Sequence, residues 1–324
     1  MSWVTRNEKV SGPGNSLQSL GCGADKLGMA TKPRCVLPGT IQMVTRRCSE
    51  RRFFLLPELF VTQTFEYLLG HFSQKYGIAI HAFVAMSNHY HLVVTDVEGR
   101  LPDFERDFNS MLARALNWHW KRWEAFWDRE SYSAVKLLEE QDVISKIGYV
   151  LANPVKARLV GRAREWEGAT SAGMGFGHRR RIQRPDRFFR EESTMPEEVD
   201  LVLTRPAGFE GLNDREVLEL VRAEVGRREA LHREKGMARK MGEVFKQEWW
   251  ECPASFDPRR KLRPTVAGKN KWARIEALQR AGEWLADYYE ALRRFVGGEQ
   301  GVVFPRGTWH MRVRLGCPVA AAGS

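Results

Sequence analysis

The segment from Ile78 to Thr95 constrains the fold of this chain more than any other feature of the sequence. It is rich in β-branched and aromatic residues, and a polar break interrupts it at Met86-Ser87-Asn88. Two β-prone stretches with so short a break between them predict a β-hairpin. A tight turn can join only antiparallel strands, whereas parallel strands need a long crossover. An all-parallel sheet is therefore excluded.

The regions on both sides of this hairpin alternate between strand and helix patterns. Residues 40–45 are β-prone, and apolar residues at helical spacing over 65–76 predict a helix that Gly77 ends. Another amphipathic helix, a strand and a third helix are expected at 104–115, at 131–137 and from Asp142 to Asn153-Pro154. The order β-α-β-β-α-β-α predicts the α+β class, with a ferredoxin-like split βαβ antiparallel sheet and helices on one face.

The composition changes after about residue 170, which predicts a separate C-terminal region. A glycine-rich run at 173–177 is followed by six arginines between residues 178 and 190. Asn213 and Glu216 form a capping-box pattern at the start of one helix, and apolar spacing predicts another helix over 271–295. We therefore expect a flexible N-terminal arm, an α+β domain, a basic linker and a mainly α-helical C-terminal region, at 1–38, 39–172, 173–212 and 213–324.

The charge balance favours an anionic partner. Lys and Arg number 51 against 40 acidic residues, a formal net charge of +11, and such an excess is typical of proteins that bind nucleic acid. No apolar stretch reaches the length of a membrane helix, and no secretory signal is expected at the N-terminus. The five cysteines are scattered, which indicates a reducing compartment rather than a disulfide framework.

Two histidines, His89 and His91, stand at the start of the second strand of the predicted hairpin. Alternate residues of a strand share one face, so both imidazoles project to the same side and Tyr90 to the other. Two imidazoles on one face form half of a site for a divalent metal. The pattern alone is also compatible with a solvated strand end, and both interpretations stay open.

Tyr149 and Asn153 are four residues apart on a predicted helix and therefore share a face. A tyrosine can act as a covalent nucleophile, and the amide oxygen of an asparagine can complete a metal site. The structural alternatives are a core aromatic at Tyr149 and a helix C-cap at Asn153, directly before Pro154.

Two segments together resemble a known family. Met86–Val94, with its two histidines, is similar to the His-hydrophobic-His signature of single-tyrosine HUH transposases. Tyr149–Val160 resembles the tyrosine helix of the branch called REP-associated tyrosine transposases. The strand that follows Trp127 also lies where that family has one. The resemblance covers about residues 40–170 of the chain.

The resemblance implies an enzyme that nicks and joins single-stranded DNA, a transposase or a domesticated relative of one. His89, His91 and Asn153 would hold Mg²⁺ or Mn²⁺. Tyr149 would attack the scissile phosphate and form a covalent 5′-phosphotyrosine. Lys156 is a candidate contact for a phosphate of the DNA.

The resemblance also implies hairpin-forming single-stranded DNA as the partner, a monomer or homodimer, and a bacterial, cytoplasmic, nucleoid-associated protein. The arginine run either binds DNA or is a basic linker without that role, and its candidate contacts are Arg179, Arg180, Arg181 and Arg184. A non-enzymatic binder of single-stranded DNA or RNA on the same scaffold is the main alternative. A hydrolytic metallonuclease, in which Tyr149 is only structural, is a further one.

Overall fold

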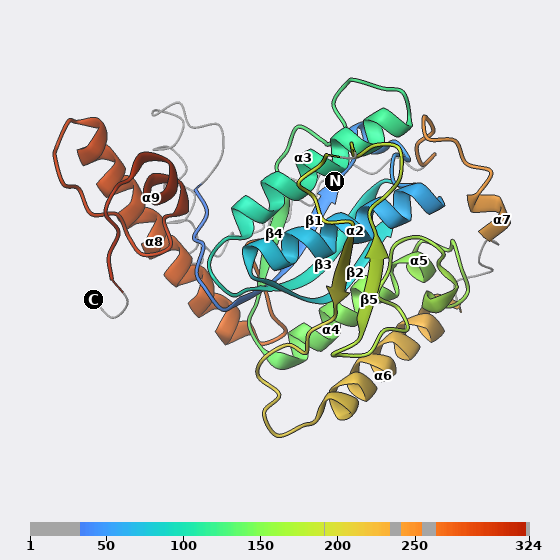
Figure 1. The fold of residues 1–324 in the computed structure, drawn as a ribbon. Coiled ribbons are helices and arrows are strands. Elements are labelled where there is room, and N and C mark those ends of the chain that lie inside the picture. The colour runs from blue at the N-terminus through green and yellow to red at the C-terminus, as the bar shows by residue number, and fades with distance from the viewer. Residues whose placement is uncertain (1–32, 191, 234–240, 255–263, 322–324) are drawn as a thin grey trace, which may run out of the picture. The chain divides into compact units, whose positions relative to one another are not determined.

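The computed structural model describes residues 33–190, 192–233, 241–254 and 264–321 (Figure 1). Most of the expected N-terminal arm, 1–38, lies outside these described residues. The chain divides into two compact units. One contains residues 36–279, and the other contains the described parts of 1–35 and 280–324. The sheet and every candidate site residue belong to the first unit, so residues 213–279 group with the sheet and not with the C-terminal end.

The first unit is built on a five-stranded sheet in the order β2-β3-β1-β4-β7. The strands are β1 (Thr40–Arg47), β2 (Ile78–Met86), β3 (His89–Asp96), β4 (Ser133–Leu137) and β7 (Val266–Ala267). Adjacent strands among the first four are antiparallel, and β7 pairs parallel with β4. Because β3 lies between β1 and β2, the connection is the split βαβ that the sequence predicts. The predicted α+β class is confirmed.

Helices cover both faces of the sheet and not one, which corrects the expectation. On one face lie α2 (Leu59–Tyr76) and α3 (Leu101–His119). On the other lie α4 (Glu140–Leu151), the short α5 (Asn153–Lys156) and α6 (Asp214–Arg233). The reason is visible in β3, where Leu92, Val93 and Val94 are all fully buried. Successive strand residues face opposite sides, so both faces carry apolar side chains that need cover.

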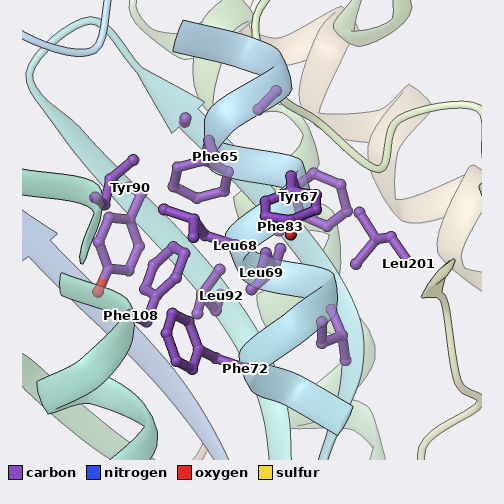
Figure 2. Close-up of a cluster of buried hydrophobic side chains, with 14 of the residues drawn as sticks. Phe65, Tyr67, Leu68, Leu69, Phe72, Phe83, Tyr90, Leu92, Phe108 and Leu201 are labelled. Carbon is purple, nitrogen blue, oxygen red and sulfur yellow. The ribbon is translucent and has the colours of Figure 1, made fainter. Parts of the chain in front are cut away.

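Aromatic side chains fill the core between the sheet and the α2–α3 layer (Figure 2). The Phe65 ring lies edge-on to Phe108 at 5.3 Å and to Tyr90 at 5.6 Å between centroids. Such edge-to-face pairs fix the orientation of each ring as well as burying it. This layer therefore gives β3 a rigid backing on the side away from its histidines.

Local signals set the ends of the helices. Gly77 ends α2 in the left-handed conformation at φ 60°, as predicted, and a residue with a Cβ would be strained there. Asn213 and Glu216 exchange hydrogen bonds at the start of α6, which confirms the capping box. At α4 the cap residue is Glu139, and Asp142 completes a capping box from the third helical position.

The segment 173–212, expected as a basic linker, contains two paired strands, β5 (Arg179–Gln183) and β6 (Glu198–Val202). Alternation explains the difference, because Ile182, Val199 and Leu201 are buried while Arg179 and Arg181 are exposed on the other side of the strand pair. Arg180 is on the same side as Ile182 and pairs with Glu66 on α2. Both strands contact α2, where Gly70 lets Val199 approach closely. Short three-residue 3₁₀ turns occur at Ser49–Arg51 and Ala163–Glu165, and α7 spans Met241–Val244.

The boundary between the two units falls within α8 (Lys271–Val296). The second unit has its own core, in which Tyr288, Phe304 and Met311 are buried. The helix α9 (Trp309–Leu315) ends at Gly316, which is again left-handed. None of the helices within the described ranges is both long enough and apolar enough to span a bilayer.

Candidate active site

Strand β3 places His89 and His91 on one face, with ring centroids 4.8 Å apart. Tyr90 points to the opposite face, where it is fully buried. Its hydroxyl donates a hydrogen bond to Glu105 Oε2 at 2.9 Å and lies 3.0 Å from Asn109 Oδ1. Tyr90 is therefore part of the core and is separated from the histidines by the sheet itself.

Hydrogen bonds fix the orientation of both imidazoles. His91 Nδ1 lies 2.7 Å from Thr45 Oγ1, and His89 Nδ1 lies 2.7 Å from Asn88 Oδ1. Asn88 donates from its Nδ2 to the carbonyl oxygen of Arg51, which turns Oδ1 toward His89. A carbonyl-type oxygen only accepts, so His89 carries its proton on Nδ1. The Thr45 hydroxyl can accept from His91 Nδ1 in the same way, and in that tautomer the Nε2 lone pair of each ring is available, as in metal-binding histidines.

Both histidines are held in the neutral form. Burial lowers the pKa of His89 to about 3, and the positive charges of Arg47, Lys156 and Arg51 add to the effect. Burial also lowers the pKa of His91 well below its ordinary value, with further contributions from His89 and Lys156. A neutral imidazole is the form that binds a metal ion. The electropositive surroundings are also those expected around a phosphate-binding site.

Helix α4 brings Tyr149 to the histidines. The centroid of its ring lies 5.5 Å from that of His91, at an angle of 69°. Lys156 Nζ lies 4.8 Å from the Tyr149 ring centroid, and Lys146 Nζ and Arg228 Cζ each lie 5.8 Å from it. The tyrosine ring thus has an imidazole beside it and three cations around it.

Asn153 is the first residue of α5, one helical turn after Tyr149, and is only 6% exposed. Its Nδ2 is buried without a hydrogen-bond partner. Buried amides are almost always hydrogen-bonded, so this one fits a position that is completed by a ligand. A half-turn of the amide exchanges its oxygen and nitrogen, and the oxygen can then bind a cation. Imidazole nitrogens and amide oxygens are ligand types that divalent metals accept. The described residues contain no group of three His, Cys, Asp or Glu placed to hold a metal ion.

Helix α6 packs against the part of α4 that carries the tyrosine. A Cβ at Gly148 would lie only 2.4 Å from Glu224 Cγ, so the two helices meet where α4 has no side chain. Arg228 donates to both the carbonyl oxygen and the hydroxyl of Ser145 at 3.1 Å, and forms an ion pair with Glu224 at 2.7 Å. This packing could not be predicted from the sequence pattern. The one signal was a glycine inside a helical pattern, which often marks a close approach.

The four arginines proposed as DNA contacts lie on or next to β5, away from these contacts. Arg179 pairs with Asp200 at 2.8 Å, and Arg181 with Glu198 at 3.4 Å. Arg180 pairs with Glu66 on α2, and Arg184 donates to the carbonyl oxygen of Met195 at 2.6 Å. These partners tie the arginines to the β5–β6 pair and α2. The cations near the histidines and Tyr149 are others, namely Arg47, Arg51, Lys146, Lys156 and Arg228.

Comparison with solved structures finds a neighbour described as a REP-associated tyrosine transposase bound to a REP hairpin. The two share 16% sequence identity, and the match covers 44% of this chain and 82% of the other, with a TM-score of 0.37. No protein-family model and no curated protein matches the chain. A likeness at this TM-score shows nothing about function, which depends on the side chains of the site.

Proposed function

We propose that this protein cleaves and rejoins single-stranded DNA through a covalent bond between Tyr149 and a 5′-phosphate. The observation that carries the proposal is the position of the Tyr149 ring, 5.5 Å from the His91 imidazole, whose Nδ1 is hydrogen-bonded to Thr45. A nucleophile, a metal half-site and a set of cations on one face of a sheet together fit phosphoryl transfer. The net charge of +11 fits a nucleic-acid substrate.

In the proposed reaction the Tyr149 oxygen attacks the phosphorus of a phosphodiester. The bond from phosphorus to the 3′-oxygen breaks, the tyrosine loses its proton, and the 3′-oxygen leaves as a hydroxyl. The reverse reaction, with another 3′-hydroxyl as the nucleophile, joins two strands and restores the tyrosine. The number of phosphoester bonds stays constant, so the joining step needs no nucleotide cofactor.

His89, His91 and Asn153 would hold the divalent cation, Mg²⁺ or Mn²⁺, through the two Nε2 atoms and the amide oxygen. When bound, such an ion stabilises the negative charge that develops on the phosphate. Thr45 and Asn88 keep the imidazoles in the required tautomer.

The surrounding cations supply the remaining stabilisation of the phosphate. Lys156 is exposed and lies close enough to both histidines for its charge to lower their pKa values. It can therefore contact a phosphate at the site. The two sequence motifs resemble those of REP-associated tyrosine transposases, and this resemblance supports a hairpin-forming DNA strand as the substrate.

The alternative of a non-enzymatic binder that stacks bases on the sheet finds no support in the strands. That mode needs exposed aromatic side chains on central strands. Phe83 and Tyr90, the aromatic residues of β2 and β3 apart from the histidines, are fully buried. The hydrolytic alternative differs from the proposal only in its nucleophile, and experiment can separate the two.

The test is incubation of the full chain with 3′-end-labelled hairpin DNA and Mg²⁺ or Mn²⁺, followed by a denaturing protein gel, because the fragment on the 3′ side of the cut is the one that stays on the tyrosine. We expect labelled protein from the wild type and from Tyr90→Phe, which alters a hydroxyl on the opposite face. We expect none from Tyr149→Phe, although that variant keeps the ring and should still bind DNA. Cleavage by Tyr149→Phe at the rate of the wild type would contradict the proposal and favour attack by water.

A further inference from the structure

The C-terminal end of α3 carries two exposed tryptophans. Trp118 is 47% exposed in the last turn of the helix, and Trp123 is 86% exposed in the segment that follows. An indole is a large apolar group, and folding normally covers most of it. Two such side chains left open so close together in the sequence indicate a surface that binds something.

Asn117, the residue before Trp118, holds the segment with Trp123 against the helix. Its Nδ2 donates to the carbonyl oxygen of Glu124 at 3.0 Å, and its Oδ1 accepts from Arg122 Nη1 at 2.9 Å. Trp123 lies between these two residues in the chain, so its backbone is fixed beside the last turn of α3. Both tryptophans therefore belong to the same end of the helix.

Aromatic neighbours support the Trp118 ring from below. Phe60, near the start of α2, and Phe188, in the loop after β5, each have a ring centroid 5.9 Å from that of Trp118. His119 stacks on Phe60 at 4.6 Å. An exposed aromatic ring on a packed support is suited to stacking against an unpaired base.

The loop after β5 is anchored on α2, which brings Phe188 to this place. Gln63 donates from Nε2 to the carbonyl oxygen of Gln183, the last residue of β5, at 3.0 Å. Farther along α2, the Tyr67 ring centroid lies 5.5 Å from that of Phe189. The loop and the end of α3 thus form one continuous surface, although they are far apart in the sequence.

Three exposed cations near Trp118 have no partner. Arg114 lies one helical turn before Trp118 and shares its face, and the Lys121 amide donates to the Trp118 carbonyl oxygen at 3.2 Å. Arg187 directly precedes Phe188. Among the described residues, nothing forms a hydrogen bond or an ion pair with any of these three side chains. Their charges are therefore available to an anionic ligand.

The charge balance of the two segments favours such a ligand. Residues 114–124 and 184–190 contain six lysines and arginines against two acidic residues, Glu124 and Asp186. Glu124 is already paired with Arg122 at 3.6 Å. Exposed indoles among uncompensated cations suit an unpaired nucleic-acid strand, whose bases stack and whose phosphates pair with the cations. An apolar protein partner would instead bury these charges without partners.

This surface is separate from the candidate active site. It is built from α2, α3 and the loop after β5, which pack on the Tyr90 side of the sheet. His89, His91 and Tyr149 lie on the other side, under α4. A strand held here is therefore not held by the residues of the proposed reaction.

We propose that Trp118 and Trp123, together with Arg114, Lys121 and Arg187, form a second binding surface for an unpaired DNA strand. The two indoles stack on bases, and the three cations contact phosphates. The surface holds a part of the DNA that is not being cut. It rests on the proposed function only for the choice of DNA over RNA.

The test measures binding in full-length protein with Tyr149→Phe, so that no strand is cut, and with EDTA present, because this surface uses no metal ion. The probes are a fluorescent oligodeoxythymidylate and an abasic strand of the same length. We expect Trp123→Ala and Trp118→Ala each to weaken binding of the thymidylate by about fivefold or more and to leave the abasic strand unaffected. The control is Trp272→Ala, which removes a 75% exposed indole at the start of α8.

Trp118→Ala also removes packing against Phe60 and Phe188, so its melting temperature is measured in parallel. Trp123 is almost fully exposed, and Trp123→Ala should melt with the parent. The result for Trp123→Ala therefore decides the proposal even if Trp118→Ala fails to fold.

A charge variant tests the phosphate contacts. Lys121→Gln should weaken binding of both strands and reduce the slope of log affinity against log salt by about one. Lys136→Gln, at an exposed position on β4, is the matched control. An unchanged slope in Lys121→Gln would overturn the phosphate contact at this lysine.

The remaining outcomes separate this surface from other partners and from the reaction. Equal thymidylate affinities for Trp123→Ala and Trp272→Ala would overturn base stacking, and a change of oligomeric state in Trp123→Ala with unchanged DNA affinity would assign the surface to a second copy of the chain. Tighter binding of oligouridylate than of the thymidylate would overturn the choice of DNA. If Trp123→Ala loses affinity as expected and the wild type forms no adduct, the surface stands and the covalent reaction fails. An adduct from the wild type with full affinity in Trp123→Ala gives the reverse.

Discussion

Thr45 and His91 are directly opposite each other in the antiparallel pair of β1 and β3, and Thr45 Oγ1 lies 2.7 Å from His91 Nδ1. The register of the sheet therefore supplies the hydrogen-bond partner of the histidine Nδ1. Because the strand pairing determines which residue faces His91, a hydroxyl on β1 becomes part of a site that is built mainly from β3 and α4. A hydrogen bond to the second ring nitrogen is what makes a histidine a well-oriented ligand.

The first prediction concerns this contact. Thr45→Val keeps the shape of the side chain but removes the oxygen, so His91 loses the partner of Nδ1. We expect affinity for Mn²⁺ to fall about tenfold or more, as titration calorimetry would show. Thr40→Val, which removes a hydroxyl bonded to the Leu37 carbonyl at the start of the same strand, is the control. Equal Mn²⁺ affinity in the two variants would argue against a metal at His91.

The second prediction concerns the packing of α6 on α4. Gly148→Ala places a methyl group 2.4 Å from Glu224 Cγ, and ion pairs with Arg227 and Arg228 hold that glutamate. We expect a loss of about 1–3 kcal/mol in the free energy of unfolding, measured in urea, and slower adduct formation. Gly226→Ala on α6 meets open space and should instead gain up to about 1 kcal/mol. A Gly148→Ala protein as stable as the parent would contradict this packing.

The third prediction concerns acid stability. Burial lowers the pKa of His81 to about 4, against an opposing hydrogen bond to the Thr204 carbonyl. Because the ordinary value is 6.5, the unfolded chain binds a proton at this residue before the folded chain does. The free energy of unfolding should therefore fall as the pH drops from about 6.5 to 4, by about 3 kcal/mol from this residue in total.

The variant that checks this is His81→Gln. Its free energy of unfolding should change less steeply between pH 7 and 5 than that of the parent. His178→Gln, at an exposed histidine, is the comparison variant. Equal slopes in all three proteins would show that His81 is protonated normally in the folded state.

The fourth prediction concerns Lys156, whose Nζ lies 4.8 Å from the Tyr149 ring centroid. Lys156→Gln should weaken DNA binding at low salt and reduce the slope of log affinity against log salt by about one. Fluorescence anisotropy over a salt series measures both. Lys136→Gln, at an exposed position on β4, should leave the slope unchanged. The same slope for both variants would remove Lys156 from the phosphate site.

Features that depend on neighbouring residues along the chain could be predicted from the sequence. The turn at Ser87–Asn88, the left-handed Gly77 and the capping box at Asn213 each depend on a few adjacent residues. The shared face of His89 and His91 follows in the same way, from the alternation of a strand.

Features that depend on long-range partners could not be predicted. The arginines of β5 indicate a charged segment, but only the pairing with β6 and α2 shows that Arg180 neutralises Glu66. An amphipathic pattern predicts that α6 buries one side, yet it does not say that Gly148 is the residue it meets. The left-handed Arg51 likewise has a partner far from it in the sequence, because Asn88 donates to its carbonyl oxygen.

The measurement that tests the central claim most directly identifies the residue that becomes linked to DNA. Wild-type protein is incubated with a hairpin-forming strand and Mn²⁺, denatured and digested with protease and nuclease, and its peptides are analysed by mass spectrometry. The account predicts one modified peptide, containing Tyr149, with the added mass of a nucleotide on the phenol oxygen. A nucleotide on any other residue, or cleaved DNA with no modified peptide, would contradict it.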